Sequence, residues 1–197
     1  MSGTIRGADV PRIVYLSVTP MLRKLLLIVV ITGFSVTSMA RGTYQEPEDF
    51  LSETFAGEPP EPAVIWLTGE RKDTVKQILG HRYTSLRVRY WQEAERSVWI
   101  LDEIGKDQPI TVGVVVNAGR MENIKVLVFR ESRGWEIRHS FFTDQFKQAS
   151  LEADHQLDKQ IDGISGATMS VRAMKKLATL ALYLDAEIRK QDVPPAP

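Results

Sequence analysis

The sequence contains no cysteine among its 197 residues. This absence excludes disulfide bonds, iron–sulfur clusters, Cys-ligated zinc, covalent c-type haem, a lipobox anchor and a thiol nucleophile. Redox chemistry in such a chain therefore has to use an organic cofactor. The length and the 43% hydrophobic fraction are those of one ordinary globular domain.

An excess of either charge is also missing, because 25 Lys and Arg residues balance 25 Asp and Glu residues. Residues 1–40 hold four basic residues and one acidic residue, so the remaining chain has a net charge of −3. Recognition of nucleic acid requires clustered positive charge. We therefore expect no nucleic-acid partner.

Long hydrophobic runs are scarce, and the one at Leu25–Val36 follows two basic residues and precedes Ser38-Met39-Ala40. This order is typical of a secretory signal peptide, and the run is shorter than the roughly 20 residues of a transmembrane helix. We predict that residues 1–40 are an N-terminal extension and signal peptide, with Met21 as the start and cleavage after Ala40. The protein would then lie in the periplasm or cell envelope, and an uncleaved membrane anchor is the alternative.

Residues 41–69 are predicted to be a lead-in segment with a short helix that starts at Pro47 and buries Phe50, Leu51 and Phe55. A second helix is expected at 72–79, ended by Gly80. Alternation with period two and short polar connections predict an antiparallel meander. Its strands are expected near 86–91, 98–101, 110–116 and 124–129.

A long helix is predicted from Met169 to Arg189 by an apolar stripe with three-four spacing. The fold class is thus α+β, an antiparallel β-sheet covered by helices with a long C-terminal helix. Residues 191–197 are predicted to be a disordered tail.

The segment Asp162-Gly163-Ile164-Ser165-Gly166-Ala167-Thr168 lies just before this helix. Small residues that lead into a helix N-terminus allow close approach of the backbone, and the free N–H groups there favour a phosphate. A P-loop would need a lysine after the second glycine, and a nucleophile elbow would need a glycine where Ala167 stands. Neither motif is present.

The pattern Asp-x-x-Ser-Gly-Ala-Thr resembles the FMN-binding domain family, which includes the flavin-carrying extracytoplasmic subunits of ion-pumping NADH:quinone and ferredoxin:NAD oxidoreductases. In this family a flavin transferase joins the phosphate of FMN to the threonine. The resemblance implies that Thr168 is the attachment residue and that Asp162, Ser165, Gly166 and Ala167 help to bind FMN.

Further segments follow the family order over about residues 108–190. The hairpin 110–129 is followed by a loop similar to the family's Glu-Thr-Pro-Gly, here Glu131-Ser132-Arg133-Gly134, and then by Phe142-x-x-Gln145-Phe146. The resemblance implies that Glu131 and Gly134 are cofactor-binding residues, although the Thr-Pro of the loop is replaced. We predict that the FMN-binding domain covers residues 70–190.

The expected function is that of an exported flavoprotein with covalent FMN, an electron carrier between membrane or periplasmic redox proteins rather than a stand-alone enzyme. We assign no catalytic residue of the chain itself and no metal site, because His81, His139 and His155 lack ligand partners at known spacing. Two alternatives stay open. One is a flavin-dependent reductase of a small molecule, and the other is a non-redox module in which Thr168 binds a phosphate or only caps the helix.

Overall fold

The computed structural model describes residues 42–192. The predicted signal peptide and its cleavage position, and residues 193–197 of the predicted tail, lie outside these residues. Within the described range, no helix is both long enough and apolar enough to cross a membrane.

The described chain forms one antiparallel sheet of six strands in the order β1-β6-β5-β4-β3-β2. The four long neighbours, β3 (Arg87–Glu93), β4 (Arg96–Ile104), β5 (Pro109–Asn117) and β6 (Arg120–Phe129), form the predicted meander. The sheet also has two short edge strands, β1 (Gly42–Thr43) and β2 (Ala63–Trp66), which the sequence analysis did not predict. The predicted α+β class is confirmed.

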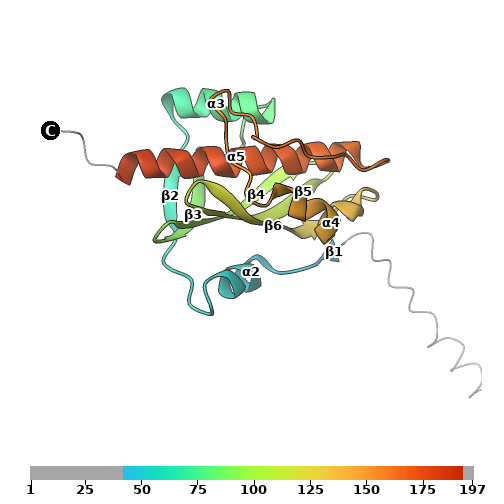
Figure 1. Ribbon diagram of the computed structural model, residues 1–197, viewed down its shortest axis with the longest axis horizontal. Helices are drawn as coiled ribbons and strands as arrows, with labels where there is room; N and C mark the ends of the chain where they lie inside the picture. Colours follow the sequence, from blue (N-terminus) through green and yellow to red (C-terminus); the bar gives the residue numbers. More distant parts are fainter. Residues whose placement is uncertain (1–41, 193–197) are drawn as a thin grey trace, which may run out of the picture. The chain divides into compact units, whose positions relative to one another are not determined.

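Helices α5 and α3 lie on one side of the sheet, with α5 packed on the strands and α3 packed on α5, as Figure 1 shows. Helix α3 (Gly69–Leu79) ends at Gly80, which has the left-handed φ of +74° that favours glycine. Helix α5 (Thr168–Asp192) is the predicted C-terminal helix and extends two residues into the segment predicted as a tail. The apolar stripe of α5 is buried against the sheet, as the spacing predicted. Its members are Val171, Met174, Leu177, Ala178, Ala181, Leu184 and Ile188.

The opposite face carries α2 (Pro47–Thr54), the helix predicted in the lead-in segment, with Pro47 in its first turn. Phe50, Leu51 and Phe55 form a second, smaller core with Val98, Val115 and Leu127 of the sheet. The ring of Phe50 lies against Gly113, where an added Cβ would come within 2.4 Å of it. A glycine in the middle of β5 is therefore needed for the packing of α2.

Short helical turns connect the sheet to α5. They are η1 (Trp135–Arg138), α4 (Ser140–Thr143) and η2 (Asp144–Phe146). Phe142 and Phe146 are fully buried, so both belong to the core. Between η2 and α5 the chain contains one isolated antiparallel bridge, between Leu151 and Leu157.

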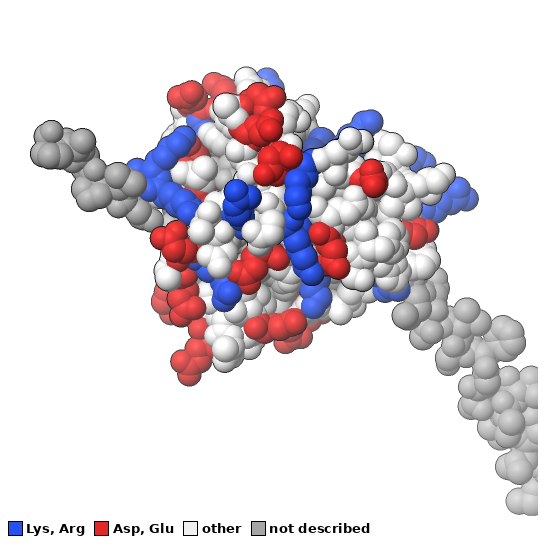
Figure 2. Space-filling model, viewed as in Figure 1, with Lys and Arg blue, Asp and Glu red and all other residues white. Residues whose placement is uncertain are grey.

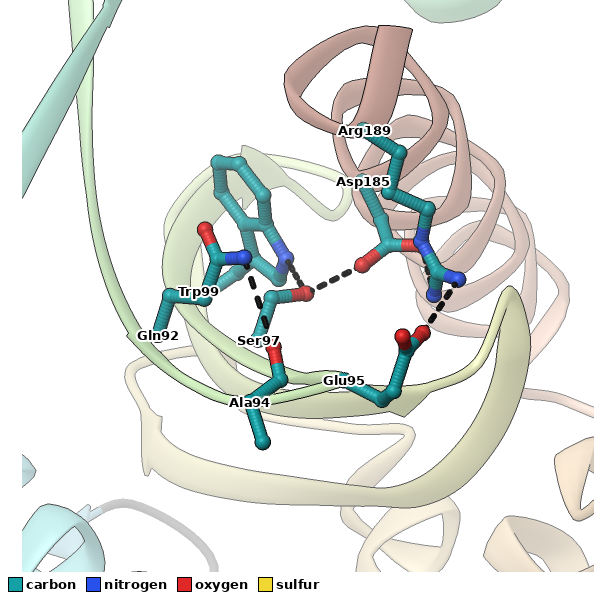
Figure 3. Close-up of polar contacts among 7 residues, drawn as sticks. All are labelled: Gln92, Ala94, Glu95, Ser97, Trp99, Asp185 and Arg189. Atoms are coloured by element: carbon teal, nitrogen blue, oxygen red, sulfur yellow. Dashed lines mark hydrogen bonds and ion pairs between the residues drawn. The ribbon is translucent and has the colours of Figure 1, made fainter. Parts of the chain in front are cut away.

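The C-terminal half of α5 is fixed to the β3–β4 hairpin by a buried polar network, drawn in Figure 3. Asp185, only 1% exposed, accepts a hydrogen bond of 2.6 Å from Ser97 Oγ, which itself accepts one from the Trp99 indole at 2.9 Å. Arg189 donates to the other Asp185 oxygen at 2.7 and 2.8 Å and pairs with Glu95 on the surface at 3.2 Å. Every oxygen of the buried carboxylate is thus satisfied, as buried charges require.

Candidate functional site

The loop before α5 is held by the segment that precedes it in the chain. The Asp162 backbone N–H donates to Gln145 Oε1 at 2.7 Å, and the Ala167 N–H donates to the Ile164 carbonyl at 3.0 Å. The latter bond closes a tight turn in which Gly166 has a φ of +82°, a conformation that L side chains rarely adopt. The turn therefore depends on Gly166 and delivers the chain directly into the helix.

Thr168 is the first residue of α5, and it is exposed. The first helical bond runs from the Val171 N–H to the Ala167 carbonyl, so the N-cap position belongs to Ala167. This geometry is against the reading of Thr168 as a simple cap. Its hydroxyl and the N–H groups of Thr168, Met169 and Ser170 have no hydrogen-bond partner among the described residues. They are available to an anion at the positive end of the helix.

A cavity of about 560 Å³ opens beside Thr168. It joins the two loops that the sequence analysis singled out, whose nearest ends, Gly134 and Asp162, lie 28 positions apart in the chain. It also includes Lys106 of the β4–β5 turn. Its lining residues are Lys106, Glu131, Ser132, Arg133, Gly166, Ala167, Thr168, Met169 and Ser170. The size lies within the range of small-molecule pockets.

Glu131 organises the β4–β5 turn. Its side chain is 4% exposed, and Oε1 accepts hydrogen bonds from three successive backbone N–H groups, those of Lys106, Asp107 and Gln108, at 2.5, 2.6 and 2.8 Å. Burial alone would raise the pKa of this carboxyl, but the three N–H bonds and the Lys106 charge outweigh burial and hold the pKa below its ordinary value. Glu131 is thus an ionised support that places Lys106 at the cavity.

Gly134 lets the second loop pack closely on the start of α5. Its φ is +84°, and an added Cβ would lie 2.4 Å from Ser170 Oγ and 3.4 Å from the Ala167 Cβ. A side chain at this position would therefore push the loop away from the first turn of the helix.

The structure brings together five of the seven predicted cofactor residues. Glu131, Gly166, Ala167 and Thr168 line the cavity, and Gly134 packs on it. Asp162 and Ser165 are exposed and do not line it. Within the described part of the chain, Asp162 contributes its backbone N–H to the loop's anchor on Gln145.

Sequence reasoning assigned no role to five of the lining residues, which are Lys106, Ser132, Arg133, Met169 and Ser170. Lys106 stands in a surface turn with no motif around it, and its contact with the site depends on Glu131, 25 residues later. Ser170 is buried, and its hydroxyl has no hydrogen-bond partner among residues 42–192. Trp135, Phe141, Phe142 and Phe146, the aromatic residues between the two loops, do not line this cavity.

Charges of both signs are mixed over the face seen in Figure 2. Attraction of an anion to this protein therefore depends on local groups of charged side chains rather than on a surface of one sign. At the cavity, Arg133 is exposed and forms no ion pair or hydrogen bond with a described residue, which leaves its guanidinium free for an anion. Residues 42–192 contain no group of three or more His, Asp or Glu side chains that could hold a metal ion.

Comparison with known proteins agrees with this geometry. Residues 105–183 match the family model described as FMN-binding domain. The match begins at the glycine next to the Glu131-bound turn, includes both loops of the cavity and ends within α5. A search of curated proteins and a search of solved structures found no significant match. Residues 105–183 therefore belong to the FMN-binding domain family, which makes this chain an FMN-binding flavoprotein.

Proposed function

We propose that the protein is exported from the cytoplasm and carries FMN as a phosphoester of Thr168, through which it passes electrons between redox proteins. The main support for this proposal is the exposed hydroxyl of Thr168, which has no partner among the described residues. It lies at the first position of a helix with three free N–H groups, in a domain of an FMN-binding family.

The residues at the cavity fit the cofactor. A phosphodiester at Thr168 would lie at the N-terminus of α5, with the free N–H groups and the Arg133 side chain available to its negative charge. Lys106, whose ammonium forms an exposed pair with Asp107 at 3.6 Å, lines the same cavity. The ribityl and ring portions need concave space, which the 560 Å³ cavity offers between the loops. Ser170 and the uncapped backbone supply hydrogen-bond donors that the fold itself does not use.

FMN supplies the one- and two-electron chemistry when it is bound. The chain positions it. Gly166 sets the turn, Gly134 allows the loop to approach the helix, and Glu131 holds the turn that carries Lys106. Because a phosphoester lies at the far end of the cofactor from the ring, the attachment leaves the redox centre chemically unchanged.

Export is supported by the sequence of residues 21–40. A chain that crosses a membrane unfolded cannot retain a noncovalent cofactor, and no twin-arginine signal is present in this segment. A covalent bond formed after export by a flavin transferase would prevent loss of FMN to a dilute exterior.

The experiment is to express the full chain with an extracytoplasmic flavin transferase and to examine the purified protein by denaturing gel fluorescence and intact mass. We expect a fluorescent band, the mass of FMN less one water, and an N-terminus at Arg41. The variant Thr168→Ala should lose both the fluorescence and the added mass, whereas Thr179→Ala, three turns further along the same helix, should retain them. A colourless wild type would refute covalent attachment, and fluorescence in Thr168→Ala would place it elsewhere.

A further inference from the structure

A second cavity, of about 490 Å³, also has Thr168 in its lining. It is bordered by α3 through Gln77 and Ile78, by the loop at 154–159, and by α5 from Thr168 to Thr179. Thr168 therefore stands on the rim between two cavities. The first accounts for the cofactor, and the second has no part in the function described so far.

Positive side chains dominate this second cavity. Four cations line it, while the lining contains one carboxylate, Asp154. The cations are Lys159, Arg172, Lys175 and Lys176. Such a concentration of one sign contrasts with the mixed surface in Figure 2 and favours an anionic ligand or partner.

Two of these cations have no internal role. Lys176 pairs with the buried Glu103 carboxylate at 2.9 Å, and Lys159 donates to the Lys147 carbonyl at 2.5 Å, so both serve the fold. The side chains of Arg172 and Lys175 form no hydrogen bond or ion pair with any residue between 42 and 192. Their charges are left for something outside the chain.

The position of the two free cations relates them to the cofactor. Arg172 and Lys175 follow Thr168 by four and seven residues, so all three lie on one face of α5 within about 10 Å of helix length. The positive end of the helix dipole adds to the same local field. An anionic surface bound here would lie next to the attachment site.

We propose that this second cavity is the docking surface for a protein redox partner that presents carboxylate side chains beside its own redox centre. The proposal rests on the proposed function, since it assumes FMN at Thr168. When reduced FMN is the donor, it gives up two electrons to the oxidised centre of the partner and its protons to water. No covalent bond between the proteins forms or breaks.

The first measurement is the reoxidation of the dithionite-reduced holoprotein by stopped flow. The oxidants are ferricyanide, an anion, and tris(phenanthroline)cobalt(III), a cation, each of which accepts one electron. The double variant Arg172→Glu/Lys175→Glu should lower the second-order rate constant for ferricyanide about tenfold at low ionic strength and raise that for the cobalt complex. Both differences should shrink with added salt.

The matched control is Arg87→Glu/Arg89→Glu, which changes the net charge equally on the sheet face covered by α2. Both of these arginines are exposed and line a separate cavity with Leu51 and Trp91. The control should alter either rate constant less than twofold.

The second measurement tests for a protein partner directly, with an acidic flavodoxin as the probe and calorimetry of its binding to the oxidised holoprotein. Reversal of Arg172 and Lys175 should weaken binding about tenfold, and the control pair should not. Unchanged rates and binding in the Arg172/Lys175 variant would overturn the inference. An effect on ferricyanide without one on flavodoxin would also overturn it, since the cavity would then serve a small anion. A preparation without covalent flavin would instead refute the proposed function.

Discussion

The two ends of α5 differ in how their polar groups are satisfied. At the C-terminal end, the Asp185 carboxylate receives bonds from Ser97 and Arg189, and Arg189 reaches Glu95 as well. At the N-terminal end, the Thr168 hydroxyl and the first three backbone N–H groups have no partner among the described residues. One helix therefore has an end that fixes it to the sheet and an end that is open to a ligand.

This difference separates stability from function along a single element. Buried groups that are fully paired resist change, because removal of one partner leaves the other uncompensated. Groups left without partners contribute nothing to the fold and are available for binding. The comparison predicts that variants at the two ends affect different observables.

The largest expected effect is that of Asp185→Ala. It leaves Arg189 and Ser97 without their shared partner, and we expect a loss of about 3–5 kcal/mol in the free energy of unfolding, measured by urea denaturation. FMN attachment in the remaining folded protein should be unchanged. The control Glu95→Ala, at the exposed side of the same network, should cost at most about 1 kcal/mol. A loss below about 1 kcal/mol for Asp185→Ala would show that the network of Asp185, Ser97 and Arg189 contributes little to the free energy of unfolding.

A smaller effect is expected from Glu131→Gln, at the other end. The change keeps the side-chain shape but removes the charge that accepts three N–H bonds, so about 2 kcal/mol should be lost at neutral pH. Covalent FMN should also form more slowly, because the turn that carries Lys106 is no longer fixed.

The pH dependence of this loss provides the check. The pKa of Glu131 is lower in the folded protein than its ordinary value of 4.5, so its contribution is fully present above that value and disappears as the pH falls through the lower, folded pKa. The stability difference between wild type and Glu131→Gln should therefore shrink in acid. Burial raises the pKa of Asp185. The stability of the wild type as a function of pH would therefore combine the opposite contributions of Asp185 and Glu131, and the difference between the two proteins is needed. A difference that is constant with pH would contradict the assignment, and Glu58→Gln, at an exposed position, should show no loss.

The smallest effect is expected from Gly134→Ala, with a loss of about 1–2 kcal/mol from the positive φ and the contact with Ser170. The double variant Gly134→Ala/Ser170→Ala should recover the part due to the Ser170 hydroxyl, the nearest atom to the added Cβ. Gly163→Ala is the control, because an added Cβ there meets no atom within 4 Å. Equal losses for Gly134→Ala with and without Ser170 would show that the loop does not pack tightly on the helix.

Much of the fold could be predicted from local patterns. The period-two alternation predicted the meander, and the stripe from Val171 to Ile188 predicted which face of α5 is buried. The strands β1 and β2 could not be predicted, because segments of two and four residues are too short to show a period and depend on their neighbours in the sheet.

The candidate site was predictable only where residues are contiguous. The segment ending at Thr168 and the loop from Glu131 to Gly134 stand out in the sequence, and the structure places both at one cavity. The contributions of Lys106 and Ser170 arise from tertiary contacts, as does the Ser97–Asp185 hydrogen bond across 88 residues of chain. The periodicities of helices and strands relate only residues that are near in sequence, so they cannot predict such pairs.

The alanine at the N-cap of α5 has a consequence for maturation. A Ser or Asp at position 167 could cap the first turn of the helix with its own side chain, whereas Ala167 cannot; in the proposed holoprotein the phosphate on Thr168 would take that place. Attachment of the cofactor would then complete the helix as well as load it. A copy without the cofactor would lack this cap, and its first helical turn would exchange amide hydrogens faster than that of the proposed holoprotein.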